Sequence, residues 1–348
     1  MAKPVRVGII GTGGIARFAH IPGYKAQPDV EIVAFCDVVP GRAEAAAKEF
    51  GVPKAYTDYR EMLAKEQLDA VSVCTPNFAH KDATIAALEA GCHVLCEKPI
   101  AMNLQEGKEM VEAARKAGKT LQVGLNNRFH PESLTIKRFA EAGEFGDIYY
   151  GEAVYLRRRG IPTWGVFTQK ELQGGGALID IGVHVLDRTL WFMGNPKPVA
   201  VMGATYANFG KRTDLATPAG MWDAERFNVD DMGVAMVRFE NGATLILKAS
   251  WDGHIEDSFT ETRILGTHGG AVMSPLKIFK DMHGTMVNVT PAGLPKVQTH
   301  TQEIEHFIAV VRGETECMVK PEQVLDVQAI LDAIYRSAET GREVLVER

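Results

Sequence analysis

The chain has 348 residues, of which 46% are hydrophobic and 24% are charged, and its formal net charge is −6. This length suits about two domains, and the composition is that of an ordinary globular protein, which excludes a small binding module, a repeat fibre and a disordered scaffold. The slightly acidic balance gives no field that would attract nucleic acid or anionic lipid, so small-molecule partners are expected.

Alternating runs in the first part of the chain predict a parallel sheet. Short runs rich in Val, Ile, Ala and Cys alternate there with longer segments of helical periodicity. This alternation is typical of parallel strands joined by crossover helices. The predicted strands are residues 5–10, 32–36, 70–74, 93–96 and 121–123. We therefore expect a doubly wound α/β domain over residues 1–124.

After residue 126 the pattern changes to a helix at 132–142 followed mainly by alternating strands. The strands are predicted at 149–156, 199–206, 232–239 and 243–251, with one helix at 178–192 between them and an amphipathic helix at 320–337. These elements predict an α+β domain with an antiparallel sheet over residues 125–348. Since strands such as 232–237 are partly apolar on both faces, we expect a homodimer or homotetramer formed through the sheet.

Cysteine and histidine spacing indicates no metal site and no disulfide framework. Cys36, Cys74 and Cys96 lie inside apolar runs and are expected to be buried, reduced thiols. The N-terminal apolar run at 7–10 is too short for a signal peptide, and no apolar run reaches the roughly 18 residues that a membrane span needs. The expected location is the cytoplasm.

The segment Gly11-Thr12-Gly13-Gly14-Ile15-Ala16 follows the first predicted strand and opens a helical segment. In this context the glycines make a tight turn that presents backbone amides to a pyrophosphate, although a tight turn without a ligand is the alternative. Asp37, at the end of the second strand, is predicted to bind the adenosine ribose. Its charge repels a 2′-phosphate and favours NAD over NADP. Arg42 is either a partner for that phosphate or a solvated helix charge.

Two polar clusters follow neighbouring predicted strands: Cys74-Thr75-Pro76-Asn77 and Cys96-Glu97-Lys98-Pro99. Both lie at the carboxyl edge of the sheet, where open α/β sheets bind ligands, so both are expected to face the cofactor. Lys98 is either a solvent-exposed loop lysine or a fixed functional side chain, and the restriction that Pro99 places on the backbone favours the second interpretation.

Asp180 and His184 are four residues apart on the predicted helix at 178–192 and lie off its apolar stripe. A histidine that titrates near neutrality can accept the proton of a hydroxyl as hydride leaves the carbon, and a carboxylate one turn away can orient it or bind another hydroxyl. An ordinary pair on a helix surface is an equally good interpretation of the spacing alone.

Together these segments resemble the Gfo/Idh/MocA oxidoreductases. The resemblance rests on the glycine motif, on Thr75-Pro76-Asn77 with His80, on Glu97-Lys98-Pro99, on Gly-Leu-Asn-Asn-Arg-Phe at 124–129 and on residues 175–184, all in the family's order. It implies an NAD-binding Rossmann domain, a C-terminal domain with a large open-faced sheet, and an active site of Lys98, Asp180 and His184. The implied cofactor-binding residues beyond the glycine motif, Asp37 and Arg42 are Thr75, Pro76, Asn77, His80, Glu97, Lys98 and Asn126.

The substrate is expected to be recognised by segments that vary within such a family, residues 157–164 and 208–227. Trp164 offers an apolar face to a sugar ring, and Arg128 or Arg157 a donor fork to its hydroxyls; core packing and surface solvation are the respective alternatives. The predicted function is NAD-dependent oxidation of a secondary hydroxyl of a cyclic polyol, such as an inositol, or of a sugar. The alternatives are a glycosidase-like enzyme that uses transient oxidation and elimination, and a non-catalytic NAD-binding regulatory protein.

Overall fold

The computed structural model describes residues 3–218 and 220–347, which divide into two compact units. Unit 1 comprises Met1–Phe129 and Val297–Leu325, and unit 2 comprises His130–Lys296 and Asp326–Arg348. This division differs from the predicted domains 1–124 and 125–348, because a later helix returns to the first unit. Helix α9 (Thr299–Val311) places Ile304, Phe307 and Ile308 in the same apolar core as strands β1 (Val5–Ile10) and β2 (Val30–Cys36).

Unit 1 contains a six-stranded sheet in the order β3-β2-β1-β4-β5-β6, and every pairing is parallel. The strands are β1 (Val5–Ile10), β2 (Val30–Cys36), β3 (Lys54–Tyr56), β4 (Ala70–Val73), β5 (His93–Cys96) and β6 (Leu121–Val123). The predicted doubly wound Rossmann fold is confirmed. The strand order reverses between β1 and β4, which is where such sheets bind dinucleotides.

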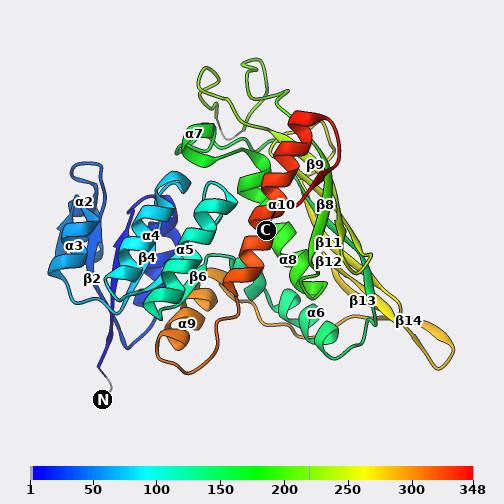
Figure 1. Cartoon of the computed structure of the whole chain (residues 1–348), viewed down its shortest axis with the longest axis horizontal. Helices are drawn as coiled ribbons and strands as arrows, with labels where there is room; N and C mark the ends of the chain where they lie inside the picture. Colours follow the sequence, from blue (N-terminus) through cyan, green and yellow to red (C-terminus); the bar gives the residue numbers. More distant parts are fainter. Residues whose placement is uncertain (1–2, 219, 348) are drawn as a thin grey trace. The chain divides into compact units, whose positions relative to one another are not determined.

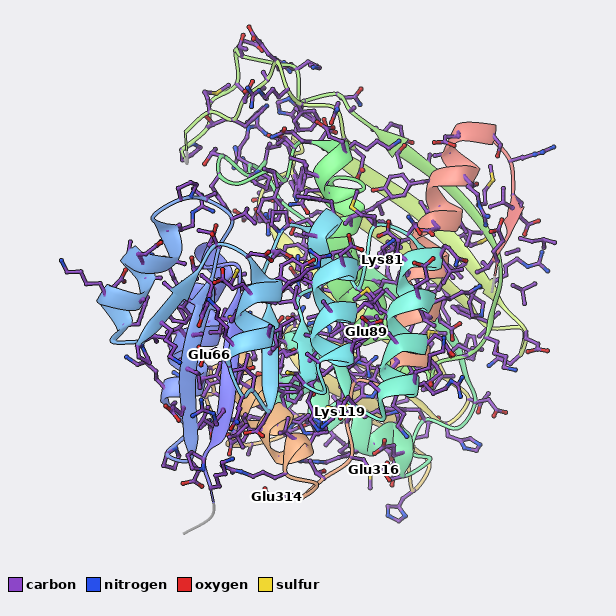
Figure 2. The ribbon with its side chains drawn as sticks, turned by 60° about the vertical axis from the view of Figure 1, so that its left-hand side comes forward. Glu66, Lys81, Glu89, Lys119, Glu314 and Glu316 are labelled. Atoms are coloured by element: carbon purple, nitrogen blue, oxygen red, sulfur yellow. The ribbon has the colours of Figure 1, made fainter. Side chains whose placement is uncertain are left out.

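Edge strand β3 is the one strand of this sheet that the sequence pattern missed. It is three residues long and lacks an apolar run. Glu66, labelled in Figure 2, follows helix α3 (Tyr59–Lys65) and accepts hydrogen bonds from Lys54 Nζ and Tyr56 Oη of the strand. Tertiary contacts rather than local pattern therefore hold this edge.

Two helices of unit 1 begin at side chains that accept a hydrogen bond from the first turn. The Asp58 carboxylate accepts from the Arg60 amide where α3 begins, and the Asn103 side chain does the same for the Glu106 amide at the start of α5. Helix α5 spans Leu104–Ala117. This part of unit 1 also contains a π-helical turn at Ala16–His20, a 3-10 turn at Asn77–Ala79 and helices α1 (Ile21–Lys25), α2 (Arg42–Phe50) and α4 (His80–Glu89). Helices α4 and α5 lie side by side (Figure 1).

Unit 2 contains a nine-stranded sheet in the order β14-β13-β12-β11-β7-β10-β9-β8-β15. Its strands are β7 (Ile148–Leu156), β8 (Pro198–Tyr206), β9 (Met232–Phe239), β10 (Thr244–Ser250), β11 (Phe259–Gly266), β12 (Gly269–Met273), β13 (Leu276–Met282), β14 (Thr285–Val289) and β15 (Val344–Leu345). Among these described strands, β7 and β10 pair in parallel and the other pairings are antiparallel. The mostly antiparallel sheet predicted for the second domain is confirmed.

The pairing of β7 with β10 brings segments that are distant in sequence to the same end of the strands. Because β7 and β10 run in the same direction, the residues after Leu156 and after Ser250 emerge together. Strand β9 runs the other way, so the residues before Met232 lie at the same edge. Three segments far apart in sequence therefore meet there, although no local pattern could predict it.

Helices cover one face of the nine-stranded sheet, with α8 (Val183–Phe192) and α10 (Pro321–Thr340) along it (Figure 1). Small residues allow this close packing: a Cβ at Gly203 of β8 would lie 3.0 Å from Ile334 of α10. Unit 2 also contains α6 (Pro131–Glu141) and α7 (Lys170–Gln173). Within residues 3–218 and 220–347, no helix is both long and apolar enough to cross a membrane.

Candidate active site

The glycine turn of unit 1 has the shape that a dinucleotide pyrophosphate requires. Gly11 has φ +89°, and a Cβ there would lie 2.6 Å from the carbonyl oxygen of Cys74, so only glycine fits beside the end of β4. At Gly13 and Gly14 an added Cβ would meet no atom within 4 Å, and the helix begins at Gly14. Backbone amides at a helix start beside open space suit the phosphates of NAD.

Asp37 lies directly after β2 and is bound to the glycine turn. Its Oδ2 accepts from the Thr12 amide at 2.9 Å and from Thr12 Oγ1 at 3.0 Å, while Oδ1 accepts from the Val39 amide at 3.0 Å. Since a carboxylate has about four acceptor sites, about one remains at Oδ1 for a ribose hydroxyl. Arg42 Nη1 lies 3.6 Å from that oxygen, and its side chain is 47% exposed. These residues fit an adenosine ribose.

His80 links the two loops that follow β4 and β5. Its Nε2 lies 3.0 Å from the Thr75 carbonyl oxygen and its Nδ1 lies 2.9 Å from that of Pro99, and the ring is fully buried. Burial lowers the pKa of His80 against the effect of these two carbonyls, and a neutral ring can donate to only one of them. His80 thus lies buried between the Thr75 and Pro99 carbonyls and donates to one of them, rather than presenting its ring at the surface.

Glu97 is a buried anion next to Lys98. Its Oε1 lies 2.9 Å from His20 Nε2, and its Oε2 accepts from the Lys98 amide at 3.2 Å. Burial alone raises the pKa of Glu97, but the His20 hydrogen bond and the charges of His20 and Lys98 lower it to about 2. His20 Nδ1 is in turn 3.0 Å from Ser72 Oγ, which is 2.7 Å from Tyr24 Oη. The sequence reasoning singled out Glu97 but missed these three partners.

Asn126 and Arg128 lie on a short 3-10 turn after β6. Asn126 Nδ2 donates to Thr299 Oγ1 at 2.9 Å. Arg128 is fully buried, and its Nη1 donates to the Met318 carbonyl at 3.0 Å and to Gln323 Oε1 at 2.7 Å. This corrects both expectations for Arg128: it is neither solvated nor presented to a substrate, because its guanidinium joins two chain segments inside unit 1.

In unit 2, Asp180 and His184 lie one turn apart on a helix that begins unusually. Residues Leu178–Gly182 form a π-helical turn, closed by a hydrogen bond from the Val183 amide to the Leu178 carbonyl, before α8 continues. Asp180 belongs to the π turn and His184 to the first turn of α8, and both side chains are partly exposed. Single π turns are rare and are frequent at functional sites.

Asp230, two residues before β9, anchors the start of this helix. Its Oδ1 accepts from the Gly176 amide at 2.7 Å and from Tyr335 Oη at 2.7 Å, and its Oδ2 accepts from the Leu178 amide at 3.0 Å. A Cβ at Gly176 would lie 1.8 Å from the Asp230 carbonyl oxygen, which explains the glycine. Asp230 therefore acts as a helix cap supplied by a segment distant in sequence.

Asp180 has a second fixed neighbour, Trp251, which directly follows β10. The Trp251 indole Nε1 donates to Asp180 Oδ2 at 2.9 Å, and the tryptophan is fully buried. The Trp251 amide donates to the Asp231 carbonyl at 2.8 Å. The sequence reasoning missed Trp251, Asp230 and Asp231. The only local signal was a pair of carboxylates directly before an alternating strand.

The arginines after β7 are engaged within unit 2. Arg157 lies over the Tyr155 ring at 5.0 Å and donates to the Gly160 carbonyl at 3.2 Å. Arg159 Nη1 donates to Asp252 Oδ1 at 2.7 Å, and Asp252 is fully buried. Arg157 is therefore packed against a ring rather than simply solvated, and it is partly exposed.

Trp164 is 63% exposed, so core packing does not account for it. Its ring makes an edge contact with Phe167 at 6.4 Å. The nearby expected recognition segment 208–227 is described except for residue 219, which lies outside the described residues. Asp231 Oδ2 accepts from the Gly210 amide at 3.1 Å, and Trp222 Nε1 donates to the Gly210 carbonyl at 2.7 Å. This loop is thus tied to the start of β9.

The described part of the chain contains no group of three or more His, Cys, Asp or Glu residues arranged to hold a metal ion. The polar groups identified above are instead hydrogen-bond donors, acceptors and proton carriers, and those of unit 1 suit a dinucleotide. A nicotinamide cofactor supplies the hydride acceptor itself, so the protein has to provide binding, orientation and proton transfer.

Comparison with known proteins assigns both units. Residues 5–125 match the family described as "Oxidoreductase family, NAD-binding Rossmann fold", and residues 133–272 match "GFO/IDH/MocA C-terminal domain". A D-glucoside 3-dehydrogenase of Escherichia coli K12 is 37% identical over 99% of this chain and 98% of its own length. A D-xylose 1-dehydrogenase (NADP(+)) of Haloferax volcanii is 30% identical over 97% and 98%. The solved structure of a levoglucosan dehydrogenase with NADH and levoglucosan superposes with a TM-score of 0.85 at 26% identity, covering 99% of this chain and 100% of that one.

Proposed function

We propose that this chain, which belongs to the Gfo/Idh/MocA family of oxidoreductases, oxidises a secondary ring hydroxyl of a glycoside with NAD as the hydride acceptor. The chain is an NAD(P)-dependent dehydrogenase that acts on CH–OH groups of sugars. The observation that carries the narrower substrate class is the 37% identity to a D-glucoside 3-dehydrogenase over 99% of the chain. The other named relatives act on related carbohydrates, which supports a sugar ring over an unrelated alcohol.

The proposed catalytic residues are Lys98, Asp180 and His184. His184 accepts the hydroxyl proton as hydride leaves the same carbon, which is the step that positioned general bases accelerate. Asp180 orients the imidazole or binds an adjacent hydroxyl, and its own orientation is set by the anchored helix described above. Lys98 contacts the cofactor and the substrate hydroxyl, and Glu97 holds its backbone amide. Trp164 is the proposed apolar surface for the sugar ring, because it is 63% exposed.

The preference for NAD is also part of the proposal. The Asp37 carboxylate, fixed by Thr12 and Val39, favours ribose hydroxyls and repels a 2′-phosphate. Relatives are named for both cofactors: three solved structures of levoglucosan dehydrogenase hold NADH and a scyllo-inositol 2-dehydrogenase is named for NAD(+), whereas the D-xylose 1-dehydrogenase is named for NADP(+). Arg42, at 3.6 Å from Asp37, is the residue that would weaken the preference.

A substrate screen tests the function directly. Methyl glycosides, free aldoses and inositols are incubated with NAD or NADP while reduced nicotinamide is followed by absorbance. Turnover on glycosides with an oxo-sugar product is the expected result. Release of a chromogenic aglycone without accumulation of reduced cofactor would indicate transient oxidation and elimination instead. No turnover with either cofactor in either direction would contradict the proposal.

A further inference from the structure

Trp251 is a buried side chain whose one polar atom points at a proposed catalytic residue. Its indole nitrogen is 2.9 Å from Asp180 Oδ2, whereas the ring itself is fully buried. Two hydrogen bonds hold the chain at and around this residue. Its amide donates to the Asp231 carbonyl at 2.8 Å, and the preceding Ser250 Oγ donates to the carbonyl of the following residue, Asp252, at 2.5 Å. The indole therefore has little freedom to turn away.

The chemistry of an indole suits a positioning role. It is a donor only and does not titrate, so it cannot exchange roles with a carboxylate or act as a base. A hydrogen bond to a carboxylate favours its ionised form. Here the bond engages Oδ2 of Asp180, and because the carboxylate is planar, holding Oδ2 also sets the direction of Oδ1. Asp180 is thus held from two sides: its helix start is anchored by Asp230, and its carboxylate is held by Trp251.

We propose that Trp251 is a positioning residue that orients the Asp180 carboxylate for the reaction. The inference rests on the proposed function, because Asp180 matters to turnover only if that assignment holds. The competing explanation is purely structural: a buried indole N–H needs an acceptor, and Asp180 happens to supply it. The two explanations differ in what they predict for kcat, since a structural bond affects stability alone.

Trp251→Phe removes the N–H and keeps an aromatic ring. The positioning role predicts that kcat falls by about 10-fold to 100-fold, because small misplacements of reacting groups cost rates of this order. In an Asp180→Asn background the same substitution is expected to have no further effect on kcat. An unchanged kcat, or an equal loss in both backgrounds, would overturn the proposal.

Trp191→Phe is the matched control for packing. Trp191 lies near the other end of the same helix and is also buried, but its substitution leaves the Trp251–Asp180 contact in place. Both variants are expected to lose thermal stability, and only Trp251→Phe is expected to lose kcat. A comparable loss of kcat in both would show that the effect comes from general loosening of the fold.

A spectroscopic test does not depend on turnover. The chain has four tryptophans, so its indole N–H signals are few in a nitrogen-correlated NMR spectrum. The signal absent from Trp251→Phe is that of Trp251; if this variant does not fold, the signal is assigned by substituting the other three tryptophans. It is expected to move as Asp180 titrates, and to stop moving in Asp180→Asn. If the wild type turns over no sugar but this signal titrates, the proposed function fails while the contact stands. A signal insensitive to pH and to Asp180→Asn would refute the contact itself.

Discussion

The proposed catalytic residues of unit 2 lie on a helix that a few fixed hydrogen bonds hold in place. Asp180 is held by the Trp251 indole, and the helix that carries Asp180 and His184 is held by the Asp230 carboxylate. In unit 1, Asp37 uses three of its acceptor sites within the protein. The effect of a substitution at these positions on turnover or cofactor affinity therefore depends on which of these hydrogen bonds remain.

His184→Ala is expected to separate proton transfer from cofactor binding. Loss of a positioned general base lowers turnover by about 100-fold to 10,000-fold. The NAD dissociation constant, measured by calorimetry, is expected to stay unchanged, because the residues that fit the dinucleotide belong to the other unit. Lys98→Ala serves as the contrasting variant, since it should weaken cofactor or substrate binding as well. Wild-type turnover by His184→Ala on the identified sugar would remove the histidine from the mechanism.

Asp37→Asn is expected to narrow the difference between the NAD and NADP dissociation constants. Asparagine keeps an acceptor for the Thr12 amide and hydroxyl but removes the charge that repels a 2′-phosphate. Asp37→Ala is a less suitable test, because it also leaves Thr12 without its partner. Arg42→Ala is the companion variant and should weaken NADP alone. Equal affinities for the two cofactors in the wild type would contradict the assignment.

Whole elements are held by buried carboxylates that come from elsewhere in the chain. Asp230 caps the helix of the proposed catalytic pair, and Glu97, bonded to His20, supports the loop after β5. The pKa values of the two carboxylates are shifted in opposite directions. Burial raises the pKa of Asp230 despite its three hydrogen bonds, whereas for Glu97 the effect of burial is outweighed by His20 and Lys98, which lower the pKa. The two carboxylates are therefore expected to make the stability of the helix start and of the loop after β5 depend on pH in different ways.

Asp230→Ala is expected to lower the free energy of unfolding by several kcal/mol, because three donors lose a buried acceptor and each loss costs about 1–3 kcal/mol. Urea unfolding measures this change. Tyr335→Phe removes only one of the three bonds and should cost much less. Turnover is expected to fall with Asp230→Ala even at temperatures where the protein stays folded, because the helix start is released. A fully active Asp230→Ala protein would show that the anchor is dispensable.

Glu97 makes stability sensitive to acid. Its folded pKa of about 2 lies below its ordinary value of 4.5, so its stabilising contribution is complete above pH 4.5 and is lost as pH falls towards 2. The shift corresponds to about 3 kcal/mol. In Glu97→Gln this part of the pH dependence is expected to disappear. Urea midpoints for both proteins across this pH window test it; parallel curves would mean that Glu97 does not contribute.

For the whole molecule, we expect assembly through the uncovered face of the nine-stranded sheet. Met202 on β8, Met236 on β9 and Ile246 on β10 are direct cross-strand neighbours, so they point to the same side. Met202 is 45% exposed and Met236 is 41% exposed, while alternate residues such as Val237 are buried on the opposite side. A contiguous exposed apolar row on a sheet is typical of an interface between subunits.

Met236→Lys is expected to dissociate the proposed homodimer or homotetramer, because it places a charge in the middle of this row. Light scattering of the wild type at micromolar concentration should show the oligomer, and the variant should show a smaller species. Ala45→Lys, at an exposed position of helix α2 in unit 1, adds the same single positive charge away from the sheet and controls for net charge. A monomeric wild type would contradict the prediction.

The sequence alone determined most of the first unit and the identity of the proposed catalytic residues. Apolar runs of strand length, the glycine turn and the polar strand ends are encoded by residues close together in the chain, so they can be recognised without knowledge of the tertiary structure. Hence five of the six strands of that sheet, and the placement of Asp37 and Glu97 after β2 and β5, were predictable.

Only the tertiary structure decided what surrounds these residues. The antiparallel pairing of β9 with β10 places Asp230 near Trp251, and the helix of Asp180 packs against β10, so both residues reach it; nothing near position 180 encodes these contacts. In the same way, α9 returns to unit 1 from residue 299, and Arg128 is buried against residues 318 and 323. Strand order and burial depend on contacts between residues far apart in the chain, whereas periodicity reports only near neighbours.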